Sequence, residues 1–370
     1  MIKNIFNVKI IFLILILLFA IPSLIHIINS GVVLESSSYF HFFINGNGLE
    51  NNGLINAIIY AGFFILLFSL YFFFLRNRNK VFENTKELFI FIGIVAAFFA
   101  LILPITSSDI FSYATTGEIQ SEYGANPYYE KIYDVKQEND TSNNEILSSI
   151  TMWDNQLVIY GPLWSFICAI VTFFSFSKVS VALFLFKLLA IGVHIFNAYL
   201  IYKMTKKNFW VILYGLNPYI LFETISNVHN DLYVVLFILL ALYFFVDKKK
   251  LVLPLLFLAC ATCVKYITVL LVPILLIYYY RNENIGKRIL MCIKSGLLFG
   301  VFVTLIYLIY LRSFDMIFYV LIQQDKIRES ITAAIYLACM NLNCINIFIC
   351  NADSLKFFFS LQFSGNIIDK

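Results

Sequence analysis

Long apolar runs separated by short polar segments dominate the pattern along the chain. Each run has about 20 apolar residues, enough for an α-helix to cross the hydrocarbon core of a bilayer. The candidate spans are 9–29, 55–75, 88–105, 179–202, 209–226, 231–247, 251–264, 266–280 and 289–311. A tenth run at 331–350 is interrupted by asparagines. The pattern predicts an all-α protein, a polytopic transmembrane helical bundle of about 9–10 spans.

One further apolar run, 160–177, decides the topology. If it does not cross, four basic clusters fall on the side of the N-terminus, at 76–80, 203–208, 247–250 and 281–288. Cytoplasmic loops are enriched in Lys and Arg, so we expect a cytoplasmic N-terminus. We also expect 161–177 to lie along the outer surface as a juxtamembrane helix that begins at Gly161-Pro162. The external loop then extends over 106–178, where acidic residues outnumber lysines.

Composition supports a membrane protein and argues against other classes. The chain is 61% hydrophobic and 13% charged, whereas about a quarter of the residues in soluble domains are charged. The net charge of +4 resides in the short basic clusters and therefore does not indicate nucleic-acid binding. The cysteines show no regular spacing that would predict a zinc site or a disulfide framework. A disulfide among Cys339, Cys344 and Cys350 stays open if they face an oxidising compartment.

Polar residues at three places fall on the external face in this topology. They are Asp109, the His229-Asn230-Asp231 cluster, and Lys265 at the turn between two half-length helices. Ionisable residues beside hydrocarbon are costly, which favours a functional role. A purely structural role is the alternative for each of these residues, since Asn and Asp cap helices and a lysine side chain can extend to the membrane interface.

Two further ionisable residues, Lys187 and Glu223, lie inside predicted spans. A mutual ion pair explains them at least as well as a catalytic role does.

The external residues suit chemistry on a lipid-linked sugar. A carboxylate can deprotonate an incoming hydroxyl, and a lone cation can bind a phosphate. Aromatic residues such as Tyr113 in the external loop offer flat surfaces for sugar rings, although an interfacial aromatic belt has the same composition. The residues therefore favour an enzyme acting on lipid phosphosugars. The alternative is a lipid-linked-sugar flippase or a small-molecule transporter, for which an internal repeat would be expected and none is found.

An ordered set of segments resembles a known family. The segments are "SSDIFSYATTGEIQSEYGANPYY", "YGPLW", "LNPYILFETISNVHNDLYVVLFILLALYFF" and "VKYITVLLVPILL", between about 88 and 280. In this order they resemble the polyprenol-phosphate-mannose-dependent α-mannosyltransferases of the GT-C superfamily, which are integral-membrane glycosyltransferases.

The resemblance implies roles for individual residues. Asp109 corresponds to the family's catalytic Asp, and Lys265 would meet the lipid phosphate. The residues expected to line the substrate pocket are Tyr113, Asn126, Pro127, Tyr128, His229, Asn230 and Asp231.

The resemblance also implies an inverting transfer of a sugar, most simply mannose, from a polyprenyl-phosphate donor. The acceptor would be a lipid-linked or cell-envelope glycan at the external face of the plasma membrane. Other sugars and a protein acceptor stay open, as does the oligomeric state. No cofactor is implied. A divalent cation held by Asp109 with Glu118 or Glu122 is compatible with the residues but not required by their spacing.

The expected organisation is one polytopic membrane domain over 1–370. Residues 1–87 would add two N-terminal helices to a GT-C-like core at 88–311, and 312–370 would form a short tail. The family usually continues with further helices, so a reduced branch and a truncated chain both stay open.

Overall fold

The computed structural model of the chain describes residues 2–30, 53–104, 107–150, 153–248 and 251–312. Every regular element within these ranges is a helix, as the apolar pattern predicts. All of them belong to one compact unit, Met1–Ser313. The run at 331–350 and Cys339, Cys344 and Cys350 lie outside the described residues.

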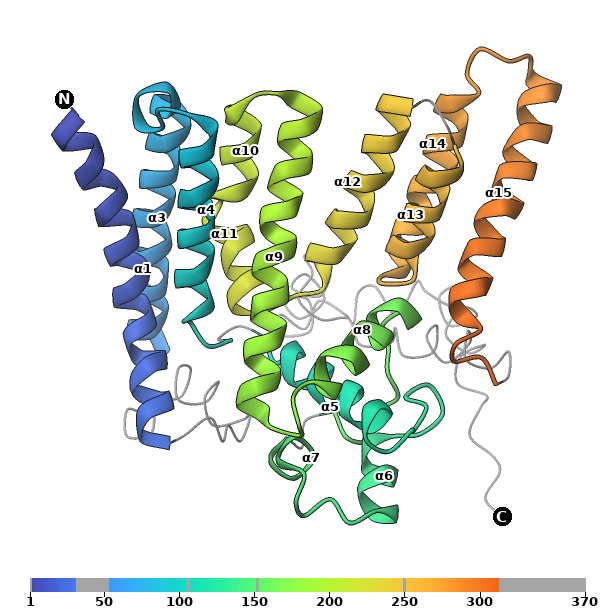
Figure 1. Cartoon of the computed structure of the whole chain (residues 1–370), viewed down its shortest axis with the longest axis horizontal. Helices are drawn as coiled ribbons and strands as arrows, with labels where there is room; N and C mark the ends of the chain where they lie inside the picture. Colours follow the sequence, from blue (N-terminus) through green and yellow to red (C-terminus); the bar gives the residue numbers. More distant parts are fainter. Residues whose placement is uncertain (1, 31–52, 105–106, 151–152, 249–250, 313–370) are drawn as a thin grey trace, which may run out of the picture. The chain divides into compact units, whose positions relative to one another are not determined.

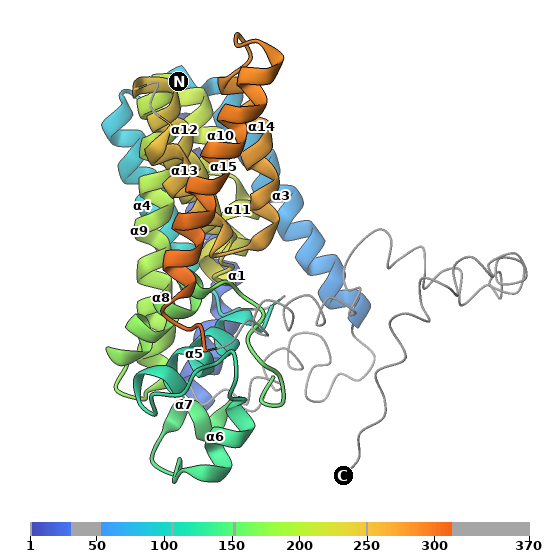
Figure 2. The same cartoon turned by 90° about the vertical axis from the view of Figure 1, so that its right-hand side faces the viewer.

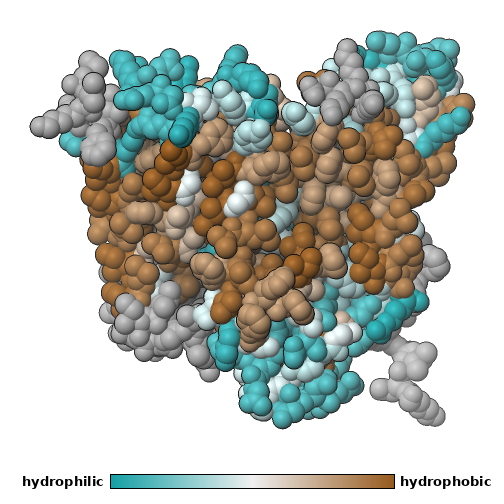
Figure 3. Space-filling view, in the orientation of Figure 1, coloured by the Kyte–Doolittle hydropathy of each residue, from teal (hydrophilic) through white to brown (hydrophobic). Residues whose placement is uncertain are grey.

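Long apolar helices form the frame of this unit. Among the described residues, four helices are long and apolar enough to cross a membrane, or five if a bent pair of helices counts as one span. The four are α1 (Ile2–Ser30), α3 (Gly53–Val81), α9 (Val179–Thr205) and α15 (Ile285–Tyr307). Their apolar surface forms a band between two polar ends (Figure 3). The chain is therefore a helical membrane protein.

The remaining predicted spans are shorter or broken. Two are α4 (Thr85–Ala100) and α12 (Asp231–Lys248). The half-length pair predicted around Lys265 is present as α13 (Val252–Thr262), the 3₁₀-helix η2 (Tyr266–Leu270) and α14 (Leu271–Tyr279). At about 1.5 Å per residue, α13 rises only about 16 Å, roughly half of a hydrocarbon core.

The single helix predicted at 209–226 is wrong in detail. The structure divides it into α10 (Asn208–Gly215), α11 (Pro218–Leu221) and the π-helix η1 (Phe222–Ser226). The break has a local cause at Asn217-Pro218. Pro218 has no backbone N–H to donate, and the Asn217 side chain accepts hydrogen bonds from Tyr219 N and Ile220 N as an N-cap.

The basic turns lie at one end of the helices. In Figure 1 the N-terminus, the α3–α4 turn, the α9–α10 turn and the α14–α15 turn are all at the top. The turn at Lys265 and the segment from α5 to α8 lie at the other end. This is the separation of charge that the sequence predicts.

Four short helices form the polar end that carries the predicted external loop. They are α5 (Asp109–Ser121), α6 (Ile132–Glu138), α7 (Glu145–Ser149) and α8 (Pro162–Phe173). Both views place them together below the bundle (Figures 1 and 2). With 12 residues, α8 is too short to cross, and it packs against α5. The predicted start of a helix at Gly161-Pro162 is confirmed, and its position along the outer surface of the membrane stays a prediction.

Two glycines allow close packing around α8. A Cβ at Gly117 of α5 would lie 2.4 Å from the Cys168 carbonyl oxygen of α8, so only glycine lets these helices approach this closely. Gly161 precedes α8, and its N–H donates to Val264 O at 3.1 Å. Its absent Cβ leaves room for the Cys263 carbonyl oxygen, which would be 2.2 Å away. These contacts bring α8 to the turn that carries Lys265.

The ion pair between Lys187 and Glu223, one of two interpretations that the sequence left open, does not form. Lys187 Nζ donates to the carbonyl oxygens of Ala100, at 2.8 Å, and of Ile102. These carbonyls lie at and just beyond the C-terminus of α4, where backbone acceptors lack helical partners and attract a cation. Glu223 instead faces His229.

Candidate active site

Asp109 lies at the first position of α5, directly after the N-cap residue Ser108. Its backbone N–H donates to Ser107 Oγ at 3.2 Å. The N-terminus of a helix carries partial positive charge, which stabilises a carboxylate there. The local sequence therefore explains how an ionised acid can be held at the edge of the apolar band.

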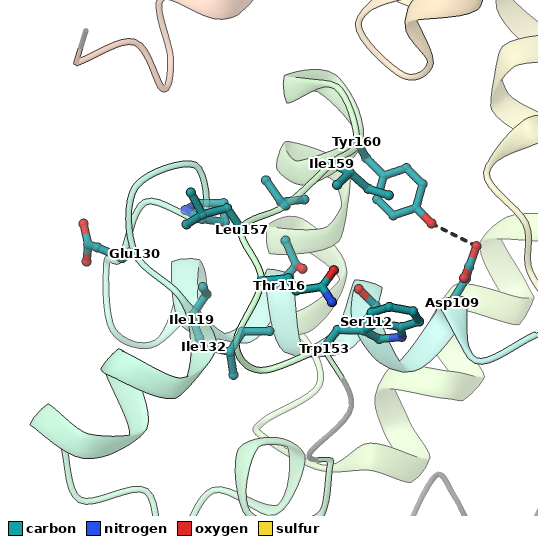
Figure 4. A pocket seen from close by; sticks show the side chains of 13 residues that line it. Asp109, Ser112, Thr116, Ile119, Glu130, Ile132, Trp153, Leu157, Ile159 and Tyr160 are labelled. Atoms are coloured by element: carbon teal, nitrogen blue, oxygen red, sulfur yellow. Dashed lines mark hydrogen bonds between the residues drawn. The ribbon is translucent and has the colours of Figure 1, made fainter. Parts of the chain in front are cut away.

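One carboxylate oxygen of Asp109 is held by neighbouring side chains. Oδ2 accepts a hydrogen bond from Tyr160 Oη at 2.9 Å and from Tyr113 Oη at 3.3 Å (Figure 4). It also lies 3.3 Å from His229 Nδ1. Among the described residues, no side chain forms a hydrogen bond or an ion pair with Oδ1 of Asp109. The two oxygens therefore have different surroundings.

The charge on Asp109 is stabilised by these neighbours. Burial raises the pKa of Asp109, but the hydrogen bond and charge of His229 and the hydroxyls of Tyr160 and Tyr113 outweigh it and lower the pKa below its usual value. Asp109 is therefore ionised at neutral pH.

His229 lies between two carboxylates. Its Nδ1 faces Asp109, and its Nε2 lies 3.1 Å from Glu223 Oε2. Burial lowers the pKa of His229, but the hydrogen bonds to Asp109 and Glu223 outweigh it and raise the pKa to about 9. At neutral pH the ring is an imidazolium that donates from both nitrogens.

A cavity of about 130 Å³ opens beside Asp109. For scale, an apolar cavity of about 150 Å³ takes up a benzene ring, so this one has room for about one six-membered ring. Its walls come from α5, from the 153–160 segment and from Pro127 (Figure 4). Aromatic rings and polar groups both line it, namely Asp109, Ser112, Thr116, Glu130, Trp153, Gln156 and Tyr160.

The other residues of the His-Asn-Asp cluster have different surroundings. Asp231, at the start of α12, forms an ion pair with Lys265 in which Nζ and Oδ2 are 2.6 Å apart. Both side chains are partly exposed, at 54% and 33%. The Asn230 side chain is completely buried, and neither its Oδ1 nor its Nδ2 has a partner among the described residues. The structure thus brings Asp231 and Lys265 together, two residues beyond His229.

Asn126 and Tyr128 face the interior and do not line this cavity. Asn126 Oδ1 accepts from Tyr128 N at 3.1 Å, and its Nδ2 donates to Tyr310 O at 2.8 Å. Tyr128 Oη donates to Tyr160 O at 2.8 Å. These bonds support the position of Tyr160, while Pro127 between them reaches the cavity wall.

Sequence reasoning missed Glu223 as a partner of His229 and missed Tyr160 as a partner of Asp109. The signal for Glu223 was an acid in an otherwise apolar run, six positions before a histidine. The signal for Tyr160 was weaker, because one tyrosine in an aromatic-rich loop is not distinctive.

The residues considered for a divalent cation do not form one ligand set. Asp109 and Glu118 are nine residues apart on the same straight helix, which separates them by about 13 Å along its axis. Glu118 also accepts hydrogen bonds from Asn144 Nδ2, at 2.7 Å, and from Ser177 Oγ. Within the part of the chain that the structure describes, no group of three His, Cys, Asp or Glu residues could hold a metal ion.

The fold and this site define a helical membrane protein with an acid–imidazole pair beside a cavity at one end of the bundle. Residues 17–281 match the family model described as alpha-(1->6)-mannopyranosyltransferase, N-terminal domain. The match covers well over half of the chain, so the chain belongs to this family of mannosyltransferases. No curated protein and no solved structure matches it.

Family membership confirms the resemblance seen in the motifs and places the protein among the glycosyltransferases. It favours an enzyme over a flippase or a transporter. The matched region begins at residue 17, before the motifs that start near residue 88, and so includes all of α3 and much of α1. The division of the domain at residues 87 and 311 stays a prediction.

Proposed function

We propose that the protein transfers mannose from a polyprenyl-phosphate donor to a hydroxyl of a glycan or glycolipid acceptor at the external face of the plasma membrane. The main observation behind this proposal is that Asp109 lies beside a cavity large enough for one six-membered ring and that only its Oδ2 atom is held by neighbouring side chains of the described residues. Family membership supports the sugar and the reaction class. The donor, the acceptor and the side of the membrane belong to the proposal.

Asp109 acts as the general base in this reaction. The acceptor hydroxyl attacks the anomeric carbon, its proton passes to Asp109 Oδ1, and the bond from the anomeric carbon to the phosphate oxygen breaks. The electron pair leaves with the polyprenyl phosphate, and the single displacement inverts the anomeric centre. Oδ2 is held by Tyr113, Tyr160 and His229, so the carboxylate is oriented before the acceptor arrives.

Cations near the cavity support an anionic donor. The His229 imidazolium contacts Asp109, and Lys265 contacts Asp231, which follows His229 by two residues. A departing phosphate gains negative charge, which positioned cations stabilise. Lys265 reaches the phosphate by exchanging its contact with Asp231 for one with the donor.

Aromatic side chains and hydroxyls support a sugar in the cavity. Trp153 and Tyr160 offer ring faces, and Ser112 and Thr116 offer hydroxyls from α5. Such a lining binds a ring with polar edges. Asn230 and the rest of the His-Asn-Asp cluster belong to the donor side, next to Lys265.

The test is sugar transfer by purified protein from radiolabelled polyprenyl-phosphate mannose, run beside the glucose donor. Replacing Asp109 with Asn keeps the size of the side chain and removes the base, so transfer falls at least about 100-fold. The matched control is Asp134→Asn, which changes an exposed acid of α6 in the same polar end. Equal transfer by wild type and Asp109→Asn would contradict the role of Asp109. A preference for the glucose donor would contradict the proposal that mannose is the transferred sugar.

A further inference from the structure

The backbone between η1 and α12 has an unusual conformation that places Glu223 beside His229. Asn227 N donates to Phe222 O at 3.0 Å, and His229 N donates to Glu223 O at 3.0 Å, so the chain is wound more widely than an α-helix. Val228 has φ of 57°, a left-handed conformation that is strained for a β-branched residue. π-turns and strained residues concentrate at functional sites.

This conformation is anchored to the bundle. Ser226 Oγ donates to Phe99 O of α4 at 2.8 Å, and Asn227 Nδ2 donates to Glu223 Oε2 at 3.2 Å. The next residue after His229, Asn230, is completely buried. His229 and Glu223 are therefore fixed against each other from both sides of the turn.

Glu223 determines what His229 can do. A neutral imidazole has one N–H, which could point to either of its two carboxylate neighbours. With a carboxylate oxygen beside each ring nitrogen, the ring holds two protons, and Nδ1–H faces Asp109 Oδ2. The Oδ1 atom is then the free proton acceptor of Asp109, as the proposed reaction requires.

We propose that Glu223 is a positioning residue of the transfer reaction, which keeps His229 doubly protonated and oriented so that Asp109 presents Oδ1 to the acceptor hydroxyl. This inference rests on the proposed function. Glu223 touches neither substrate and acts through His229.

The charged and titratable groups around His229 are known from each neighbouring element. Those in contact or one contact away are Asp109 and Tyr113 of α5, Tyr160 before α8, Glu223 of η1, Tyr219 of α11, and the Asp231–Lys265 pair. Only Asp109 and Glu223 contact the ring among these. Replacing Glu223 with Gln therefore removes one of the two carboxylates that contact the His229 ring.

The experiment measures the protonation of His229 directly. Diethyl pyrocarbonate modifies neutral imidazole, and peptide mass spectrometry of the full-length protein reports its rate at His229 between pH 6 and 10. Glu223→Gln keeps a hydrogen-bond acceptor and removes the charge. Loss of one contacting carboxylate lowers the pH at which His229 is half protonated, the midpoint of the modification curve, by about 1–3 pH units. The modification rate at pH 7 therefore rises roughly tenfold or more. Glu122→Gln, an exposed acid after α5, is the control and leaves the midpoint unchanged.

The same variants are assayed for transfer across pH. In Glu223→Gln the alkaline limb of the activity profile moves to lower pH together with the modification midpoint, and Glu223→Asp restores part of the shift. An unchanged midpoint in Glu223→Gln would overturn the inference. A uniform loss of activity at every pH would also overturn it, since that is what a purely structural role predicts. The modification measurement needs no turnover, so it tests the role of Glu223 even if the protein transfers no mannose. The transfer assay with Asp109→Asn tests the proposed function separately.

Discussion

Asp109 combines a lowered pKa with the proposed role of general base, and the surroundings of its two carboxylate oxygens explain how. The pKa of the carboxyl is lowered mainly by His229 against the effect of burial, so its affinity for a proton is modest. In the proposed reaction such a base would accept the proton only as the bond to the phosphate breaks. The proposed chemistry therefore depends on His229 as much as on Asp109.

The raised pKa of His229 predicts a definite pH dependence. In the folded protein the imidazolium persists up to a pKa of about 9, whereas an unperturbed histidine titrates near about 6.5. The stability that it contributes is fully present below about pH 6.5 and is lost as pH rises through about 9. Thermal unfolding in detergent at pH 6.5 and pH 9.5 measures the difference. His229→Gln should flatten the profile, and an equal pH dependence in both proteins would argue against the imidazolium.

Lys265 and Asp231 predict opposite changes in donor affinity. Lys265→Ala removes a phosphate contact, and a charged hydrogen bond of this kind is worth about tenfold in KM for the donor. Asp231→Asn removes the competing carboxylate 2.6 Å from Nζ, so it should lower that KM. Steady-state kinetics over a range of donor concentrations measure both. Changes of the same sign in the two variants would contradict a competition for Lys265.

At the scale of elements, the short helices and α8 depend on each other. The α13–η2 turn contacts the N-terminus of α8. The contact consists of backbone hydrogen bonds from Gly161 and Leu163 to the carbonyl oxygens of Val264 and Cys263. This explains why α13 needs no more than 11 residues: the polar end of the bundle supplies the partners for the turn at its lower end. Lys265 is placed by this contact.

Gly161→Ala tests the docking of α8. Its Cβ would lie 2.2 Å from the Cys263 carbonyl oxygen, so the two segments must separate, at a cost of about 1–3 kcal/mol. Gly192→Ala in α9 is the control, because its Cβ meets nothing within 4 Å and alanine favours a helix. Thermal unfolding in detergent compares them. Equal stability of the two variants would show that the close approach at Gly161 is not required.

At the scale of the whole described unit, charge separates along the helices. Basic turns lie at one end, and the acidic α5–α8 segment lies at the other (Figures 1 and 3). The unit has two hydrophobic clusters, and the larger extends from the long helices into the α5–α8 end. The larger includes Phe12, Phe91, Tyr113, Trp164 and Phe186, and the smaller joins α12, α13, α14 and α15.

This separation predicts the orientation in the membrane. In a cysteine-free background, Asp140→Cys near α7 should react with an impermeant maleimide on intact cells, because we place this end outside. Lys80→Cys, in the last turn of α3, should react only after permeabilisation. The reverse pattern would place the active site in the cytoplasm and overturn the proposed external location.

Several features follow from the sequence alone. Apolar runs of known length specify transmembrane helices, and the Lys and Arg bias places 161–177 outside the spans, because both signals are written locally along the chain. Asp109, His229 and Lys265 were predicted on one face for the same reason. Their catalytic and binding roles stay predictions.

Only the tertiary structure decided how these residues pair. Glu223 turns to His229 because a π-helix and a left-handed Val228 redirect the chain, and no periodicity signals such a turn. Tyr160 reaches Asp109 because α8 docks on the α13–η2 turn, a contact between segments far apart in sequence. The sequence by itself determined a helical membrane protein with basic turns at one end and an acid at the other edge of the apolar band. Packing determined which partners that acid has, because hydrogen bonds between distant segments depend on how the helices meet and not on local pattern.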